Sequence, residues 1–171
     1  MNFRCKTILA VSLALLLTAL SADAAKPSEA MIVDVPAERG DYGIPIGNVK
    51  VIFDDGHSEM WTKKGRCMLL KVSASGIVGW SFYTSRNSYK EPVNDKLRIL
   101  LSEKDIRDFQ GGPFIEDWWF TDGDTSIVIK SRERHGPAFY AKYDLKTSKC
   151  LGTASARHDP ELPEWAKPYA D

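Results

Sequence analysis

Residues 116–131 read EDWWFTDGDTSIVIKS, two runs of strand-forming residues around a polar centre. The runs WWF and SIVIKS are rich in aromatic and β-branched side chains, which favour strands. Asp122, Gly123 and Asp124 separate them, and these residue types tolerate the left-handed backbone of a tight turn. The stretch therefore predicts a β-hairpin. A calcium loop is disfavoured, because Asp122, Asp124 and Thr125 supply too few oxygen ligands for that ion.

The same alternation of short strands and turns recurs along the chain. The sequence DDG at 54–56 lies between VKVIF and HSEMWT and predicts another hairpin. Residues 101–109 fit either a hairpin or a short helix, because Ser102 and Asp105 resemble a capping box. Further strand-like runs are Ile77–Thr84, Lys96–Leu101 and Phe139–Leu145. We therefore predict an all-β, antiparallel fold with at most one or two short helices.

The chain also carries a weak internal repeat. Val49–Phe53 aligns with Leu97–Leu101, an offset of 48 residues (97 − 49), and the same offset places Val72 over Phe120. The repeat predicts three successive units of antiparallel strands. Their ranges are 49–96, 97–138 and a partial unit over 139–155.

Three phrases of the repeat resemble those of a known family. VSASGIVGW and FTDGDTSIVI resemble the turn between inner strands in WD40-like and TolB-like periplasmic β-propellers, and YDLKTSK resembles their outer hairpin. The resemblance covers residues 49–152, and the Gly-His and Trp-Asp signatures are absent. It implies blade-like sheets. Closed propellers have about four or more blades, so two and a half units form either an open array or one that assembles with copies of itself.

The N-terminus has the pattern of an export signal. Arg4 and Lys6 precede the uncharged apolar run TILAVSLALLLTAL, and Ala22 and Ala24 then give the spacing that a signal peptidase recognises. The apolar run is too short for a permanent membrane span. Cys5 precedes the run, which argues against lipid attachment. We predict cleavage after Ala24 and a periplasmic protein, with secretion as the alternative.

Composition and cysteine content limit the partners and cofactors that can be expected. We expect an extended lead-in at 25–48, followed by a single β domain over residues 49–171 that ends in a Pro-rich tail. The chain has 23 basic and 23 acidic residues, which disfavours nucleic acid and membrane surfaces as partners. Cys67 and Cys150, 83 positions apart (150 − 67), predict one disulfide in an oxidising compartment, with two separate buried thiols as the alternative. No CxxC, Cys/His cluster or cofactor motif points to a metal or cofactor.

The candidate binding residues lie around the loop KSRERHGPAFY. Arg132, Arg134 and His135 crowd beside a Gly-Pro bend, and the arginine fork suits an anion or a carboxylate. A solvated hairpin tip is the alternative. Trp118 and Trp119 are adjacent on a strand and must face opposite ways, so one should be core and the other could contact a ligand.

Catalysis has little support in the sequence. The only histidines are His57, His135 and His158, and no G-x-S-x-G, H-E-x-x-H or P-loop motif occurs. Glu116 and Asp117 are adjacent on a predicted strand and should face opposite ways, which argues against a carboxylate pair. We predict a non-catalytic binding module whose partner is another envelope protein or a small ligand. The alternatives are an immunity or enzyme-inhibitor protein and a hydrolase using His135 with a carboxylate.

Overall fold

The computed structural model describes residues 25–33, 44–86, 93–102, 104–112, 114–133, 135–159 and 161–170. The predicted signal peptide, residues 1–24, lies outside these ranges. Eleven strands form three antiparallel sheets of three, four and four strands, which confirms the predicted fold class. A short 3-10 helix, η2 (Lys167–Tyr169), lies near the C-terminus. None of the helices in these ranges is long and apolar enough to cross a membrane.

Each sheet is a meander in which strands consecutive in the chain are neighbours. The first sheet contains β1 (Pro27–Val33), β2 (Asn48–Phe53) and β3 (Ser58–Met60). The second contains β4 (Cys67–Val72), β5 (Val78–Phe82), β6 (Lys96–Ser102) and β7 (Asp105–Gln110). The third contains β8 (Ile115–Thr121), β9 (Ser126–Ser131), β10 (Phe139–Asp144) and β11 (Cys150–Ser155).

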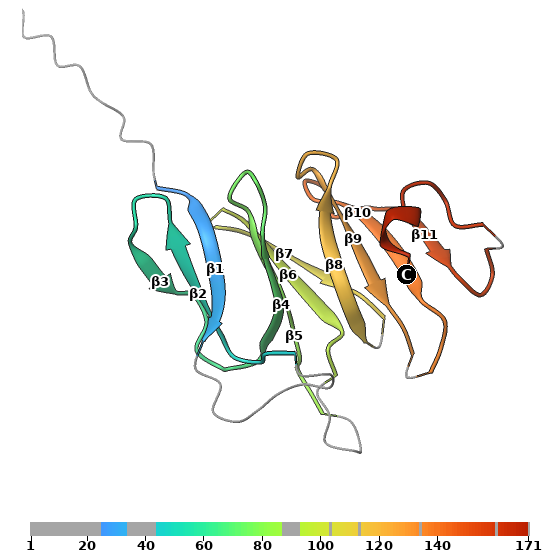
Figure 1. The fold of residues 1–171 in the computed structure, drawn as a ribbon, viewed down its shortest axis with the longest axis horizontal. Helices are drawn as coiled ribbons and strands as arrows, with labels where there is room; N and C mark the ends of the chain where they lie inside the picture. The colour runs from blue at the N-terminus through green and yellow to red at the C-terminus, as the bar shows by residue number, and fades with distance from the viewer. Residues whose placement is uncertain are drawn as a thin grey trace, which may run out of the picture.

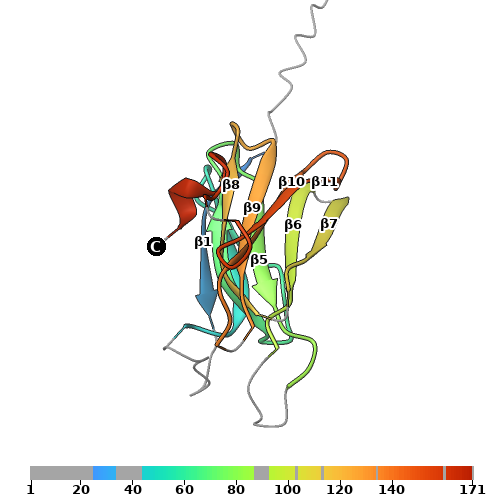
Figure 2. The ribbon, with the colours of Figure 1, turned by 90° about the vertical axis from the view of Figure 1, so that its right-hand side faces the viewer.

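The three sheets stand side by side in chain order (Figure 1). Their first strands are neighbours, with β1 against β4 and β4 against β8. Figure 2 shows β1 and β8 on one side of the molecule and β7 and β11 on the other. The second and third sheets therefore run from an inner edge on the side of β1, formed by β4 and β8, to an outer edge on the other side, formed by β7 and β11. The row does not close into a ring, so the first and third sheets are its two ends.

Apolar side chains fill both layers between the sheets, because alternate strand residues point to one face. The layer between the first and second sheets contains Val49, Val51, Cys67, Val78 and Trp80. The layer between the second and third sheets contains Leu97, Ile99, Phe109, Ile115, Trp118, Ile127, Ile129 and Leu145. A third cluster covers the outer face of the third sheet, where the C-terminal tail, residues 161–170, packs on Val128, Tyr140 and Ala154.

The predicted hairpin turns are confirmed. Asp122, Gly123 and Asp124 all have positive φ angles, of 53°, 63° and 66°, in the turn between β8 and β9. This turn also joins two sheets, because the Asp124 carboxylate accepts a hydrogen bond of 2.9 Å from the backbone N–H of Ser75 in the β4–β5 turn. Desolvation opposes ionisation of Asp124, yet its bonds from Ser75 and Ser73 hold its pKa below the usual value. Residues 101–109 form the β6–β7 hairpin and not a helix.

The sheets divide the chain at different points from the predicted units. They span 27–60, 67–110 and 115–155, so the expected lead-in at 25–48 contains a whole strand, β1. The 48-residue offset does relate the second sheet to the third, since Cys67 begins β4 and Ile115 begins β8. It pairs β2 with β6, however, which are the second and third strands of their sheets. The repeat correctly predicted that both segments are strands. It was wrong in aligning two strands that hold different positions in their sheets.

The predicted disulfide is absent, since Cys67 and Cys150 are both free thiols. Each begins a strand, but Cys67 begins the inner strand of the second sheet and Cys150 begins the outer strand of the third. Cys67 is buried and Cys150 is exposed, so the alternative of two buried thiols is half correct. Burial raises the pKa of the Cys67 thiol, which keeps it protonated and unreactive.

Thiol labelling should separate the two cysteines. In the native protein, a thiol reagent at pH 8 is expected to modify Cys150 rapidly and Cys67 only on unfolding, because only the former is exposed. Cys150→Ser should remove the fast phase and leave the slow one. If no free thiol were found in denatured, unreduced protein, the two cysteines would instead form the disulfide that the sequence predicted.

Candidate functional site

Two cavities lie beside the end of β9, and Arg132, the residue that follows this strand, lines both of them. The first, of about 300 Å³, we call the loop cavity; the second, of about 360 Å³, we call the ion-pair cavity. The loop cavity is lined by Gly112, Ser131, Arg132, Glu133, Gly136, Pro137, Phe139, Ser155, Arg157 and His158. The ion-pair cavity is lined by Ile44, Phe114, Glu116, Asp117, Trp119, Lys130 and Arg132.

The charges of the ion-pair cavity largely neutralise one another. The Nε of Arg132 contacts the Glu116 carboxylate, and Lys130 Nζ lies 3.9 Å from the same carboxylate. Lys71 Nζ lies 2.8 Å from Asp117. The Lys130 side chain is only 5% exposed, and the nearby Glu116 carboxylate offsets part of the cost of burying its charge. We interpret this cluster as structural.

A β-bulge brings Glu116 and Asp117 to the same cavity. The register passes from Ile115 opposite Ser131 to Asp117 opposite Lys130, so Glu116 is an extra residue in β8. Both carboxylates line the ion-pair cavity, and the expectation that they face opposite ways was wrong. A bulge breaks the period of two on which that expectation rested. Each carboxylate is nevertheless held by a cation of the chain itself.

The two tryptophans differ as predicted, with one in the core. Trp118 is fully buried, and its indole N–H donates a hydrogen bond of 2.6 Å to the carbonyl of Leu69. Trp119 is half-buried; its ring stacks on Tyr169 at a centroid distance of 4.6 Å, and Lys71 Nζ lies 4.9 Å from its centroid. Trp118 therefore presents no exposed surface to a ligand in this structure, and Trp119 already contacts the C-terminal tail.

The loop cavity is built by the register of three strands. Phe139 at the start of β10 lies opposite Ser131 of β9 and Ser155 of β11. Phe139 is 40% exposed, and its ring forms an apolar wall of the cavity. Gly112 lies against Ser131, and a Cβ there would come within 2.7 Å of the serine hydroxyl oxygen. Only glycine leaves this rim of the cavity in place.

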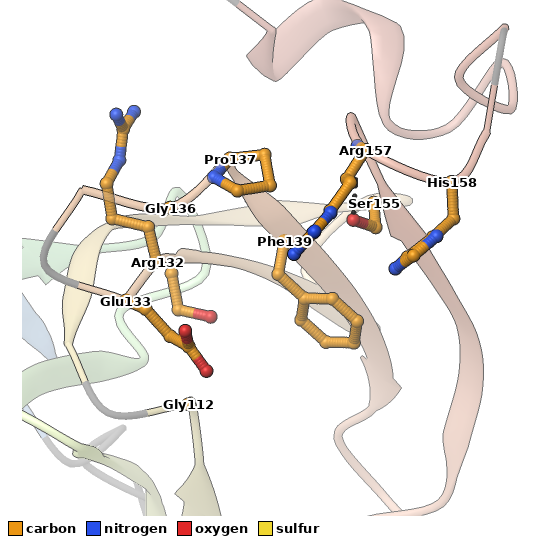
Figure 3. A pocket seen from close by; sticks show the side chains of 10 residues that line it. Gly112, Arg132, Glu133, Gly136, Pro137, Phe139, Ser155, Arg157 and His158 are labelled. Carbon is orange, nitrogen blue, oxygen red and sulfur yellow. Dashed lines mark hydrogen bonds between the residues drawn. The ribbon is translucent and has the colours of Figure 1, made fainter.

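Arg157 and His158 close the loop cavity from the other side. They lie in the turn that follows β11, where the Ser155 carbonyl accepts the His158 N–H at 3.0 Å. The Asp159 carboxylate accepts the Ser155 N–H at 2.6 Å and fixes this turn. Figure 3 shows both side chains reaching toward the Phe139 ring, whereas the Arg132 guanidinium points away from them.

The two cavities differ in their free charge. Within the ranges that the structure covers, the side chains of Arg157 and His158 have neither an ion pair nor a hydrogen bond. Glu133 is the one carboxylate among the lining residues of the loop cavity. A guanidinium, an imidazole, two serine hydroxyls and an aromatic wall can together hold an anionic group that carries an apolar part.

The predicted binding residues are thus only partly brought together. Arg132 lines both cavities but serves the ion pair with Glu116, and Arg134 lies outside the described residues. His135 is exposed and is not among the residues that line either cavity. Sequence reasoning missed Arg157 and His158. The signal that could have found them is the β10–β11 hairpin, which returns the chain from Ser155 to the start of β10.

The chain matches no family model, no curated protein and no solved structure. Among the residues that the structure describes, no group of three or more His, Cys, Asp or Glu side chains could hold a metal ion. The function is therefore inferred from the geometry of the two cavities.

Proposed function

We propose that this protein is an exported, non-catalytic binding module that holds a carboxylate or phosphate group of its partner in the loop cavity. The observation that supports this best is the placement of Arg157 and His158, without ion-pair partners in the described part of the chain, beside the exposed ring of Phe139. Arginine binds carboxylates and phosphates through two parallel N–H donors. The aromatic wall would pack on the apolar part of the same ligand.

The scaffold suits this role. The three meanders are blade-like, and the loop cavity lies where β9, β10 and β11 meet their connecting loops. Loops held on a rigid sheet are common binding surfaces. Arginine is also one of the residue types enriched among those that contribute most to binding energy at protein interfaces.

The hydrolase alternative gains no support from this geometry. It required His135 beside a carboxylate, and His135 lines neither cavity. The carboxylates of the ion-pair cavity are engaged by Arg132, Lys130 and Lys71.

The double variant Arg157→Ala/His158→Ala tests the proposal. Immobilised wild-type protein should capture a partner from envelope extract, and 3-phenylpropionate and inorganic phosphate should shift the His158 ring resonances in an NMR titration. In the double variant we expect partner capture to weaken by about tenfold or more, since a hydrogen bond between charged groups contributes about 1.5–3 kcal/mol.

The matched control is Lys149→Ala, an exposed cation at the opposite end of β11. It should leave capture unchanged, and both variants should keep the wild-type melting temperature because exposed charges add little to stability. Equal capture by the double variant and the wild type would overturn the proposal.

A further inference from the structure

The two ends of the row of sheets differ in whether their outer face is covered. The outer face of the third sheet is covered by the tail, whose Ala166 is fully buried against Val128 and Tyr140. The outer face of the first sheet carries Met31 and Met60, each 41% exposed. One end of the row therefore has a cap from its own chain, and the other end presents methionines to solvent.

The register shows which residues share this exposed face. Ala30 and Ile32 of β1 pack toward the second sheet, so the alternate residues of β1 face outward. Met31 lies opposite Lys50, which lies opposite Met60; Glu29 lies opposite Ile52, which lies opposite Ser58. We call these six residues the open face.

We propose that the open face binds the open face of a second copy of this chain. Glu29 and Lys50 are diagonal neighbours on adjacent strands, and neither has an ion pair with another described residue. A two-fold axis that lies in the interface midway between them exchanges the two positions. Lys50 of each copy then meets the partner copy's glutamate, and the methionine rows pack on each other. This inference does not depend on the proposed ligand site.

A second copy fits this face better than an unrelated partner for two reasons. The face carries one charge of each sign, so it is complementary to itself, as an isologous interface requires. Pairing through the first sheets also gives a row of six sheets, three from each copy, whose two ends are both covered by C-terminal tails. Such an assembly stops at two copies, because capped ends prevent further stacking.

The mass of the exported protein over a dilution series, measured by light scattering and sedimentation, tests this proposal. The wild type should be a dimer that dissociates on dilution. Lys50→Glu and Glu29→Lys should each weaken association by about tenfold or more, because each places like charges opposite one another.

The double variant Glu29→Lys/Lys50→Glu should restore the dimer, since it reverses both charges and recreates the pair. Lys104→Glu, an exposed change in the β6–β7 turn, is the matched control and should leave the mass unchanged. A wild-type protein that is monomeric at every concentration would overturn the proposal. So would a dimer that neither single charge reversal weakens.

Discussion

Replacing Trp118 with alanine should destabilise the protein by about 3–5 kcal/mol, the range for removing a large buried aromatic side chain. The side chain has no exposed surface, lies between the second and third sheets, and meets Phe120 edge to face at 4.9 Å. Its indole N–H is also the donor to the Leu69 carbonyl of β4. Alanine would leave both a cavity and an unpaired carbonyl at the junction of two sheets.

The measurement is urea unfolding followed by far-UV circular dichroism, with two matched variants. Trp118→Phe keeps most of the volume and loses the N–H, so its loss of stability should be clearly smaller. Trp119→Ala removes the same side chain from the half-buried neighbouring position and should also have the smaller effect. Equal unfolding midpoints for Trp118→Ala and the wild type would contradict this account of the core.

The contrast between the two tryptophans shows how far local sequence rules reach. The rule that adjacent strand residues face opposite ways predicted one buried and one partly exposed ring. It could not choose between them, because either ring could have faced the second sheet. The choice depends on contacts from elsewhere in the chain: Gly79 of β5, where a Cβ would come within 2.7 Å of the Trp118 ring, and Tyr169 of the tail.

Where sequence reasoning failed, the deciding information was non-local. Because Glu116 and Asp117 are adjacent in the sequence, they were expected on opposite faces of a strand. The bulge in β8 instead places both on the same cavity. The disulfide was expected because two cysteines in an oxidising compartment usually pair, yet the strands that they begin, β4 and β11, belong to different sheets. The hairpin turns, by contrast, were predictable because a turn involves only about four consecutive residues, and a sequence such as DG is sufficient to favour it.

The ligand-facing residues illustrate the same limit. Arg132 was singled out because cations crowd its loop, but a cation next to a buried lysine and a glutamate serves the fold. Arg157 lies 25 positions later (157 − 132) in a polar stretch without a motif. Only the pairing of β10 with both β9 and β11 brings it to the same opening.

Removing the tail by ending the chain after Asp159 should have the second large effect, on both stability and assembly. The tail covers Val128, Tyr140 and Ala154, and Tyr169 stacks on Trp119. Losing this apolar contact should lower the free energy of unfolding by roughly 3 kcal/mol, on the scale of 1.5–3 kcal/mol for each fully buried large side chain. The uncovered face would also expose these apolar side chains to solvent, which promotes association.

The truncated chain therefore separates the role of the tail from that of the open face. If the open face pairs two copies and the tail caps the far end, the truncated protein should associate beyond the dimer, because both ends of its row are now uncovered. Adding Lys50→Glu to the truncation should block the first contact and reduce the product toward a dimer joined through the third sheets. Tyr169→Ala, which removes only the ring stacked on Trp119, should lower the melting temperature without changing the mass. Sedimentation velocity and thermal unfolding should be measured for the wild type, the truncated chain, the truncated chain with Lys50→Glu, and Tyr169→Ala. A truncated chain with wild-type mass and melting temperature would show that the tail is not a cap.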